Sequence, residues 1–415
     1  MPSIPRIPGF DHTLALLRDP YRFISNQCRA LGSDIVDARF LLQRTICMSG
    51  APAAALFYGS DRLIRRGAAP GRIEKTLVGK DGVQGLDDET HRHRKQMFLA
   101  LVTPERVREL GALSETGWRQ CSRNWMTQRR TVLYSEVRRL LMRAVCDWAG
   151  VPLPEADLRR RTDEVAAMFD YAGTVGPKHW WARLARRRSE RWMRQVIEDI
   201  RSGRLRRPEN SAAWAIANHR DLAGNPLPTA VAAVELLNVL RPTVAVAVYL
   251  VLAAHALQWH PDCVRRIADG DHDYLIGFVQ EVRRYYPFFP AAIARVRRDC
   301  DWQGYALPQG CRVLMDLYGT NHDPRSWESP GEFRPERFRG WKGDPYSFIP
   351  QGGGDPQLSH RCPGEGIAVE LMAVAARFLA RNLIYTVPPQ DLDLDFARMP
   401  ALPRSRFIIS EIVWR

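Results

Sequence analysis

The longest apolar stretch of the chain runs from Val231 to Leu257, long enough for a helix through the middle of a large domain. Arg241 and Pro242 stand side by side at its centre. A proline inside a helix removes a backbone hydrogen bond and costs roughly 3 kcal/mol. A buried guanidinium without an anion costs roughly 3–5 kcal/mol more. Because no carboxylate follows within one turn on the same face, we expect the partner of Arg241 to be a ligand.

Two other interpretations of this stretch remain open at this point. The helix could cross a membrane, but Glu235, Asn238, Arg241 and Pro242 interrupt it, and a span needs about 20 uninterrupted apolar residues. Arg241 could instead be a structural arginine that pairs with a carboxylate from elsewhere in the chain. The interruptions favour a buried helix over a membrane span.

Two further segments are expected to be helical. An Ala-, Leu- and Met-rich stretch follows Cys362 to about Asn382. His91 and Lys95 stand four residues apart, which places them on one face of a helix.

Composition favours a soluble globular chain. Its 415 residues are 45% hydrophobic and 26% charged, enough for a large core. The length alone suggests two or three domains unless the fold dictates otherwise. Residues 1–8 lack the apolar core of a signal peptide or an anchor, so we expect a cytoplasmic protein.

The net charge of +14 raises the question of a nucleic-acid partner. Nearly all of the 60 basic residues are arginine, which indicates a codon bias more simply than a nucleic-acid surface. The densest basic run, Arg183–Arg194, contains Glu190 and resembles the solvated face of a helix. We therefore expect no nucleic-acid partner.

Eight cysteines without a CxxC pair suit a reducing compartment. Seven of them look like small core residues, but Cys362 follows a Gly-rich loop and precedes Pro363, at the predicted start of a helix. Free backbone N–H groups at a helix start stabilise a thiolate, and His360 and Arg361 add donors for acidic groups. This is the setting of an axial haem ligand.

Two more segments complete a known pattern. Glu281-Val282-Arg283-Arg284 and the downstream Phe333–Phe338 segment resemble the Glu/Arg/Arg triad of the cytochrome P-450 superfamily, formed here by Glu281, Arg284 and Arg337. The resemblance extends from about residue 9 to residue 412. It implies a mainly α fold with small β-sheets, one haem-thiolate domain over residues 1–415, and a b-type haem (heme b) with iron bound to Cys362.

Two departures from the general pattern narrow the resemblance. The loop between Phe348 and Cys362 is longer than usual, and Arg241-Pro242 replaces the acid–alcohol pair that delivers protons to dioxygen. Both features are similar to the fatty-acid peroxygenase branch. Four other segments are also similar to that branch: 83–87, 91–95, 176–180 and 316–323.

The resemblance implies a hydrogen-peroxide-dependent enzyme that hydroxylates long-chain fatty acids at the α or β carbon, with some decarboxylation to terminal alkenes. Peroxide removes the need for an obligatory redox partner. The substrate carboxylate on Arg241 then moves the protons that no side chain of the helix can move. Gln84 favours hydroxylation, because members of the branch that also decarboxylate commonly have histidine there.

The resemblance also assigns secondary site residues. Cations and donors for the haem propionates are expected at His91, Lys95, Arg295 and His360. The channel for the acyl tail is expected at Phe169, Tyr171, Phe288 and Phe289, for which plain core packing is the alternative. His91 and His93 could also suggest a metal site, but the arginines that alternate with them argue against one.

Two other functions compete with this one. A conventional monooxygenase would dock a ferredoxin or flavodoxin on the basic surface, but Arg241-Pro242 leaves it without proton-delivery residues. A non-catalytic haem sensor or fatty-acid carrier could retain the thiolate fold. Turnover with peroxide alone would indicate the peroxygenase, and turnover only with a reductase would indicate the monooxygenase. No turnover under either condition would indicate a sensor or carrier.

Overall fold

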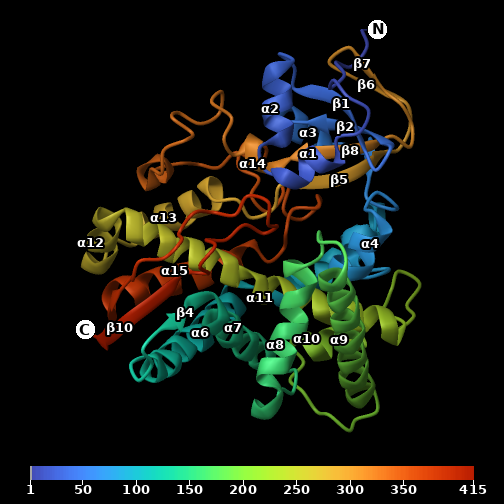
Figure 1. Cartoon of the computed structure of the whole chain (residues 1–415). Helices are drawn as coiled ribbons and strands as arrows, with labels where there is room; N and C mark the ends of the chain where they lie inside the picture. The colour runs from blue at the N-terminus through green and yellow to red at the C-terminus, as the bar shows by residue number, and fades with distance from the viewer. Residues whose placement is uncertain (1) are drawn as a thin grey trace.

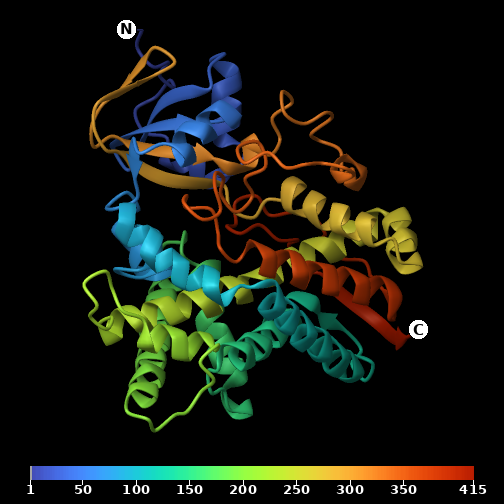
Figure 2. The same cartoon turned by 180° about the vertical axis from the view of Figure 1, so that it is seen from behind.

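The structure, a computed structural model, describes residues 2–415. Most helices gather in one part of the molecule and the main sheet in another, with the N-terminus at the sheet and the C-terminus beside the helices (Figures 1 and 2). The architecture is mainly α with small β-sheets, as the sequence predicts.

The helices vary from single turns to a 31-residue rod. They are α1 (Thr13–Arg18), α2 (Phe23–Ala30), α3 (Ala51–Gly59), α4 (Gly71–Ile73), α5 (Asp88–Leu101), α6 (Pro104–Trp125), α7 (Leu133–Ala149), α8 (Glu155–Asp170), α9 (Pro177–Arg201), α10 (Ala212–Asn218), α11 (Thr229–Trp259), α12 (Pro261–Asp269), α13 (His272–Tyr285), α14 (Leu317–Thr320) and α15 (Glu365–Arg381). Short π- or 3-10 turns are η1 (Glu74–Val78), η2 (Val83–Gly85) and η3 (Pro335–Phe338).

Three small sheets complete the fold. The largest has the strand order β1-β2-β8-β5-β3, in which β2 and β8 are parallel and the other neighbours antiparallel. A second sheet has the order β4-β10-β9, and β6 pairs with β7. The strands are β1 (Ile35–Phe40), β2 (Gln43–Met48), β3 (Leu63–Ile64), β4 (Thr131–Val132), β5 (Ala291–Val296), β6 (Cys300–Trp302), β7 (Tyr305–Leu307), β8 (Arg312–Asp316), β9 (Leu383–Thr386) and β10 (Ile408–Trp414).

Helix α11 is the predicted central helix and is the core of the helical part. It continues through Pro242 without a break and packs against α7, α9 and α15. Among the described residues it is the one helix long and apolar enough to cross a membrane, and 94% of its most apolar window is buried inside the protein. Its apolar surface is therefore covered by other helices, and the membrane-span interpretation is wrong.

Two local predictions need correction. Helix α15 begins at Glu365 with Gly364 as its N-cap, so Pro363 lies in a turn before the helix and not in its first turn. Arg186, in the run predicted to be a solvated face, is buried with a side-chain exposure of 1%. Helix α9 buries that arginine against the segment that contains η1, a packing contact that local charge density does not reveal.

The cysteines follow the prediction only in part. Cys28, Cys47, Cys146 and Cys263 are buried core residues, whereas Cys121, Cys300 and Cys311 are half-buried. All eight cysteines carry free thiols.

Candidate active site

Cys362 lies in an irregular loop that folds back on itself before α15. The backbone N–H of Cys362 donates a hydrogen bond to the carbonyl oxygen of Gln351 at 3.0 Å. Gly352 has a φ of 95°, and a Cβ there would lie 3.2 Å from the Cα of Arg361. A side chain at residue 352 would be both strained and crowded, so the glycine allows the loop to close around the cysteine.

The Cys362 sulfur is removed from water but has charged groups near it. Burial raises the pKa of the Cys362 thiol, while the backbone N–H of Gly364 and the charges of Lys95 and Arg283 act in the opposite direction. The Gly364 N–H thus favours the thiolate, as the sequence argument expects, and burial acts against it. A thiolate here needs a positive charge on the sulfur itself, such as a bound metal cation.

Four basic side chains gather beside this loop. His91 and His360 stack with ring centroids 3.8 Å apart, and the Lys95 ammonium donates to the carbonyl oxygens of Ser359 and Arg361. Arg65, which the sequence did not single out, completes the group and donates to a backbone carbonyl at 2.7 Å. The predicted residues His91, Lys95 and His360 are thus brought together, and each of them is basic.

Electrostatics in this basic cluster favour a bound anion. Burial and the charge of Lys95 lower the pKa of His91 to about 4, and burial lowers the pKa of Lys95 to about 8. Burial and the charge of Arg65 lower the pKa of His360. The neighbouring carboxylate of Asp87 accepts from the backbone N–H groups of residues 65 and 66 and stays 4.0 Å from His360. An external anion would relieve the mutual repulsion.

Arg295 is not part of this cluster. Its guanidinium donates to the carbonyl oxygens of Gly67 and Gly310 at 2.7 and 2.9 Å, where β5 meets two loops. Arg295 is therefore not placed with the histidines that were predicted to bind the same acidic groups. Arg65 is the arginine that lies beside them.

The predicted triad of Glu281, Arg284 and Arg337 is present. Arg284 binds both carboxylate oxygens of Glu281 at 2.7 Å, and Arg337 reaches the same carboxylate at 3.1 Å. Glu281 and Arg284 have no exposed surface. A fully paired, buried set of charges ties α13 to the segment around η3 and fixes the base of the cysteine loop.

Arg241 is the opposite case. Its side chain is buried, and its guanidinium donates to the backbone carbonyl of Leu77 and to the side-chain oxygen of Asn238 at 3.2 Å. No carboxylate lies within ion-pair distance of it among residues 2–415. Burial and the charge of Arg186 lower the pKa of Arg241 to about 9. A carbonyl and an amide leave the positive charge of Arg241 without a counter-charge.

Polar side chains one and two turns before Arg241 on α11 form a hydrogen-bonded row that ends at Arg241. Asn238 donates to Glu235 at 2.9 Å and to Gln84 at 3.1 Å. Glu235 is fully buried and forms an ion pair with Arg94 at 2.7 Å, so it is not free to form an ion pair with Arg241. The sequence carried the signal, because residues 235, 238 and 241 follow each other at three-residue spacing on one helix face.

A second buried arginine shares the same carbonyl. Arg186 donates to the carbonyl oxygen of Leu77 at 3.0 Å and pairs with Glu190 at 2.7 Å. Gly79, with a φ of 88°, follows η1, and a Cβ there would overlap the Arg186 guanidinium at 2.1 Å. The π-turn therefore presents one backbone carbonyl to two guanidinium groups, a feature the sequence did not predict.

The predicted channel aromatics lie in two pairs. Phe288 is buried and stacks on Tyr249 of α11 at 4.2 Å, with Phe289 at 4.8 Å from Phe288. Phe169 is buried in the main core at the end of α8, and Tyr171 is half-buried just after it.

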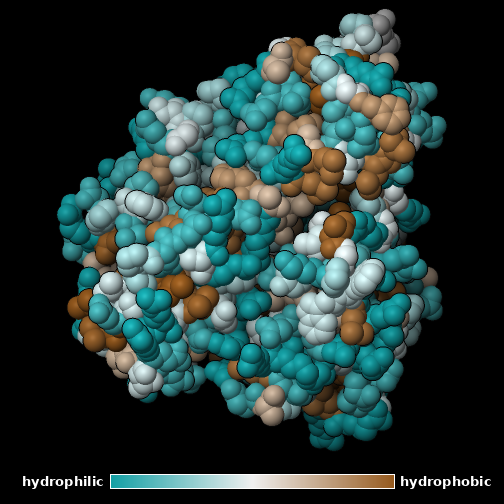
Figure 3. All heavy atoms as spheres, viewed as in Figure 1, coloured by the Kyte–Doolittle hydropathy of each residue, from teal (hydrophilic) through white to brown (hydrophobic). Residues whose placement is uncertain are grey.

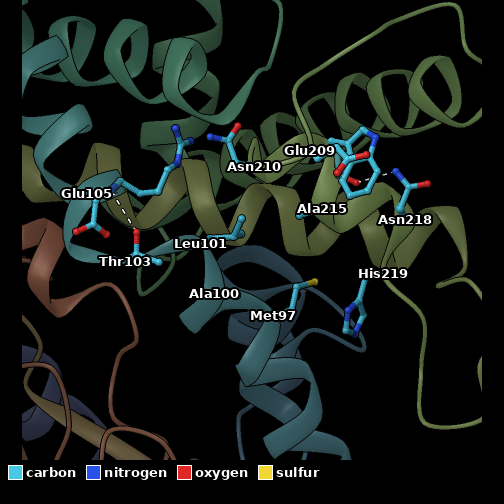
Figure 4. A pocket seen from close by; sticks show the side chains of 12 residues that line it. Met97, Ala100, Leu101, Thr103, Glu105, Glu209, Asn210, Ala215, Asn218 and His219 are labelled. Carbon is cyan, nitrogen blue, oxygen red and sulfur yellow. Dashed lines mark hydrogen bonds between the residues drawn. The ribbon is translucent and has the colours of Figure 1, made fainter.

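Neither of two surface pockets is lined by Arg241. A depression of about 410 Å³ opens onto Cys362 and is lined by Arg283, Arg361 and Glu365 among others. A larger pocket of about 570 Å³ lies between α5, α6 and α10 and contains none of the predicted site residues (Figure 4).

The sequence comparisons point to one family. The cytochrome P-450 family model matches residues 271–404. Cytochrome P-450 71D18 of Mentha gracilis is 31% identical over 135 residues, which cover 31% of this chain and 26% of that protein. Cytochrome P-450 71A8 of Mentha piperita is 27% identical over 57% of this chain and 53% of its own length. The chain thus spans about a quarter to about a half of these curated relatives.

Solved structures match over the whole length. Cytochrome P450SP alpha (CYP152B1) in complex with (R)-ibuprophen is 53% identical, covers 98% of this chain and 99% of its own, and has a TM-score of 0.96. The chain belongs to the cytochrome P-450 family. Cytochrome P450EX alpha (CYP152N1) with myristic acid is 42% identical with a TM-score of 0.97, and both chains are covered completely. A variant of cytochrome P-450 OleT in complex with arachidonic acid is 33% identical over 100% of this chain and 99% of its own, with a TM-score of 0.97.

A cytochrome P-450 carries a haem bound through a cysteine thiolate, and the residues of this chain fit that group. The basic cluster provides the cations Arg65 and Lys95 and the ring nitrogens of His91 and His360, and the nearby Asp87 carboxylate is bound to backbone N–H groups. Such a set suits the two propionates of a haem. Cys362 lies next to this cluster, since the Lys95 ammonium binds the carbonyl of Arg361. The donor set therefore suits both the iron and the acidic edge of a haem.

Proposed function

We propose that this cytochrome P-450 is a peroxygenase that uses hydrogen peroxide to hydroxylate long-chain fatty acids at the α or β carbon. The observation that carries the proposal is Arg241, a buried guanidinium without a carboxylate partner in the described chain. The solved relatives named with myristic acid and arachidonic acid support a fatty acid as the missing partner.

Cys362 would bind the iron of the haem, and Arg65, His91, Lys95 and His360 would bind its propionates. When bound, the haem supplies the iron centre at which one oxygen atom of peroxide is transferred to a C–H bond. The Gly-rich loop and the N–H of Gly364 would hold the Cys362 sulfur in place.

Arg241 would bind the substrate carboxylate with the two-pronged geometry that a planar guanidinium offers. The acid would displace the contact with the Leu77 carbonyl, while Asn238 keeps the guanidinium in its plane. Breaking the O–O bond of peroxide needs a group that takes a proton and returns it to the departing oxygen. Pro242 offers neither an acid nor an alcohol, so the carboxylate held on Arg241 would perform this transfer.

Anchoring the acid by its head group also sets the position of attack. A carboxylate held on α11 leaves the α and β carbons nearest to the reacting centre, an advantage of several kcal/mol in positioning. Hydroxylation consumes one acid and one peroxide and gives one hydroxy acid and one water. Decarboxylation consumes the same pair and gives a terminal alkene, carbon dioxide and two waters.

Gln84 would favour hydroxylation over decarboxylation. Its side-chain oxygen accepts from Asn238, so it belongs to the same network as Arg241. A neutral amide in this network cannot donate a proton to a reaction intermediate as a protonated histidine could.

Peroxide already holds both oxygen atoms at the required reduction level, so the proposed reaction needs no obligatory redox partner. Phe169, Tyr171, Phe288 and Phe289 would line the path of the acyl tail. We further propose that the enzyme works in the cytoplasm, in keeping with its eight free thiols.

The decisive assay incubates haem-loaded protein with a saturated long-chain fatty acid and hydrogen peroxide alone, with products identified by mass spectrometry. We expect 2- or 3-hydroxy acids, with a minor share of terminal alkene. Turnover only with a reductase and NADPH would support the conventional monooxygenase, and no turnover in either case would support a sensor or carrier.

The ligand assignment has a separate test. The Cys362→Ser variant should lose the red-shifted Soret band of the ferrous carbonyl complex, because that band depends on thiolate ligation. Cys121→Ser, which changes a half-buried cysteine remote from the loop, is the matched control. Survival of the band in the Cys362→Ser variant would place the ligand elsewhere.

A further inference from the structure

Arg283 of α13 is a buried cation that the proposed reaction does not use. Most charged side chains of the described residues lie at the surface, and the molecular face in Figure 3 is largely hydrophilic. Only 1% of the Arg283 side chain is exposed. It lies between Glu281 and Arg284 in the sequence but takes no part in their ion pair. Burying a guanidinium costs free energy that its partners must offset, so the partners of Arg283 indicate its role.

The guanidinium of Arg283 donates through all three of its nitrogens. Nε donates to the side-chain oxygen of Gln351 at 3.2 Å, and Nη1 donates to the side-chain oxygen of Gln280. Nη2 binds the carboxylate of Glu365. Gln280 belongs to α13 itself, whereas the other two partners belong to the loop around Cys362 and to the helix that follows it.

These two partners lie on opposite sides of Cys362 in the chain. The backbone carbonyl of Gln351 accepts from the N–H of Cys362 at 3.0 Å, and Glu365 is the first residue of α15. Helices α13 and α15 pack side by side, which brings Arg283 within reach of both (Figure 2). One guanidinium therefore joins the segment before Cys362 to the segment after it.

Arg283 and Glu365 also act on the Cys362 sulfur with opposite charges. Burial is the largest cause that raises the pKa of the Cys362 thiol, and the carboxylate of Glu365 raises it further. The charges of Lys95 and Arg283 lower this pKa. Arg283 and Glu365 both line the depression that opens onto Cys362, but their side chains are only 1% and 17% exposed. Water therefore screens the two charges weakly.

Glu365 has a second partner besides Arg283. Its other carboxylate oxygen accepts from Nε of Arg361 at 2.6 Å. A variant without the Arg283 charge therefore leaves no unpaired carboxylate beside the loop. The role of Arg283 can for this reason be tested in the folded, haem-loaded protein.

We propose that Arg283 positions the loop of Cys362, and that its charge, opposed by that of Glu365, sets how strongly the Cys362 sulfur donates to the iron. Arg283 acts through Gln351 and Glu365, and so it is a positioning residue. Groups that surround a metal ligand orient it and tune the metal. Reduction of the iron adds negative charge, so a nearby cation favours the ferrous state and a nearby carboxylate favours the ferric state. The inference rests on Cys362 as the iron ligand proposed above, and not on the peroxygenase reaction.

The experiment measures the reduction potential of the haem iron by spectroelectrochemical titration of the haem-loaded protein. Arg283→Gln should make the potential more negative, and Glu365→Gln should make it less negative. Each variant should change the ferric-to-ferrous ratio at a fixed potential by at least about threefold, or about 30 mV for a one-electron couple. Arg283→Lys keeps the charge and should stay close to wild type. The control Arg377→Gln removes a half-exposed arginine about three turns further along α15 and should leave the potential unchanged.

The signs of these shifts separate an electrostatic role from a purely structural one. If Arg283 only held the fold together, the glutamine variants would lose stability or haem, and their remaining haem would keep the wild-type potential or shift in one common direction. Either result would overturn the proposal. So would an Arg283→Lys variant that shifts as far as Arg283→Gln, because the cause would then be shape and not charge. If Arg283→Gln fails to bind haem, the Glu365→Gln variant decides, and any result other than a less negative potential overturns the proposal.

The ferrous carbonyl spectrum distinguishes this proposal from the assignment of the ligand. The red-shifted Soret band should persist in Arg283→Gln, because the Cys362 sulfur remains the ligand. A band that survives in Cys362→Ser would refute the ligand itself. A band that survives in Arg283→Gln together with an unchanged potential would refute only the role of Arg283.

Discussion

Arg284 and Arg241 are both buried in core helices, but only Arg284 meets a carboxylate. Arg284 binds both oxygens of Glu281 at 2.7 Å and three backbone carbonyls besides. Arg241 has one backbone carbonyl and one amide oxygen. Burial and the charge of Arg186 lower the pKa of Arg241 to about 9, because no carboxylate pairs with the buried guanidinium.

The difference separates a structural arginine from a ligand-binding one. A guanidinium whose charge and donors are all satisfied within the protein has nothing left to offer a ligand. A guanidinium held rigidly by neutral acceptors retains its full charge for an incoming anion. The same fold therefore contains a complete ion pair on α13 and, on α11, an arginine that lacks its anion.

Breaking the complete pair should have the largest effect. Glu281→Gln leaves Arg284 and Arg337 as buried charges without an anion, and we expect it to cost roughly 3–5 kcal/mol of stability. Chemical denaturation and haem content measured on purified protein would show this loss. Glu336→Gln, which removes an exposed carboxylate of the neighbouring η3, is the control. Wild-type stability in the Glu281→Gln variant would contradict the structural role.

A buried carboxylate without an arginine gives the reverse case. Burial raises the pKa of Asp316 to about 7 from 3.8. Between these values the folded state holds a proton that the unfolded state releases. The free energy of unfolding should therefore fall as pH rises through this window, by up to roughly 4 kcal/mol.

Urea denaturation between pH 4 and 8 measures this dependence. Asp316→Asn should flatten it, whereas Asp391→Asn, at a half-exposed carboxylate, should leave the slope as in wild type. An unchanged slope in Asp316→Asn would assign the dependence to other groups.

Removing a residue that orients Arg241 should have a smaller effect, mainly on the binding of a fatty acid. Asn238→Ala removes the amide that orients the Arg241 guanidinium, and we expect roughly tenfold weaker binding of a fatty acid. Because buried Glu235 also loses a hydrogen-bond donor, stability should fall by about 1–3 kcal/mol. Titration with a long-chain acid, followed by the haem spectrum, measures the affinity. Val251→Ala truncates a buried residue further along α11 and should lower stability without changing affinity. The opposite pattern would make Asn238 a packing residue.

The sequence could predict the parts of the site that rest on rare local patterns. Arg241-Pro242 in an apolar helix, the loop before Cys362 and the Glu281/Arg284 spacing are all visible without a structure. Arg65 and Arg186 were missed because each is one arginine among many, and only tertiary packing selects which of them turns inward. Arg295 was misplaced for the same reason, since strand pairing directs it to the carbonyls of two loops.

The central claim is that Arg241 binds the carboxylate of the substrate. The most direct test compares the affinity of haem-loaded wild type and the Arg241→Leu variant for a long-chain fatty acid and for its methyl ester, which carries no charge. Wild type should prefer the acid by about a hundredfold, and the variant should bind acid and ester equally weakly while retaining its haem. A variant that kept the wild-type preference for the acid would contradict the account.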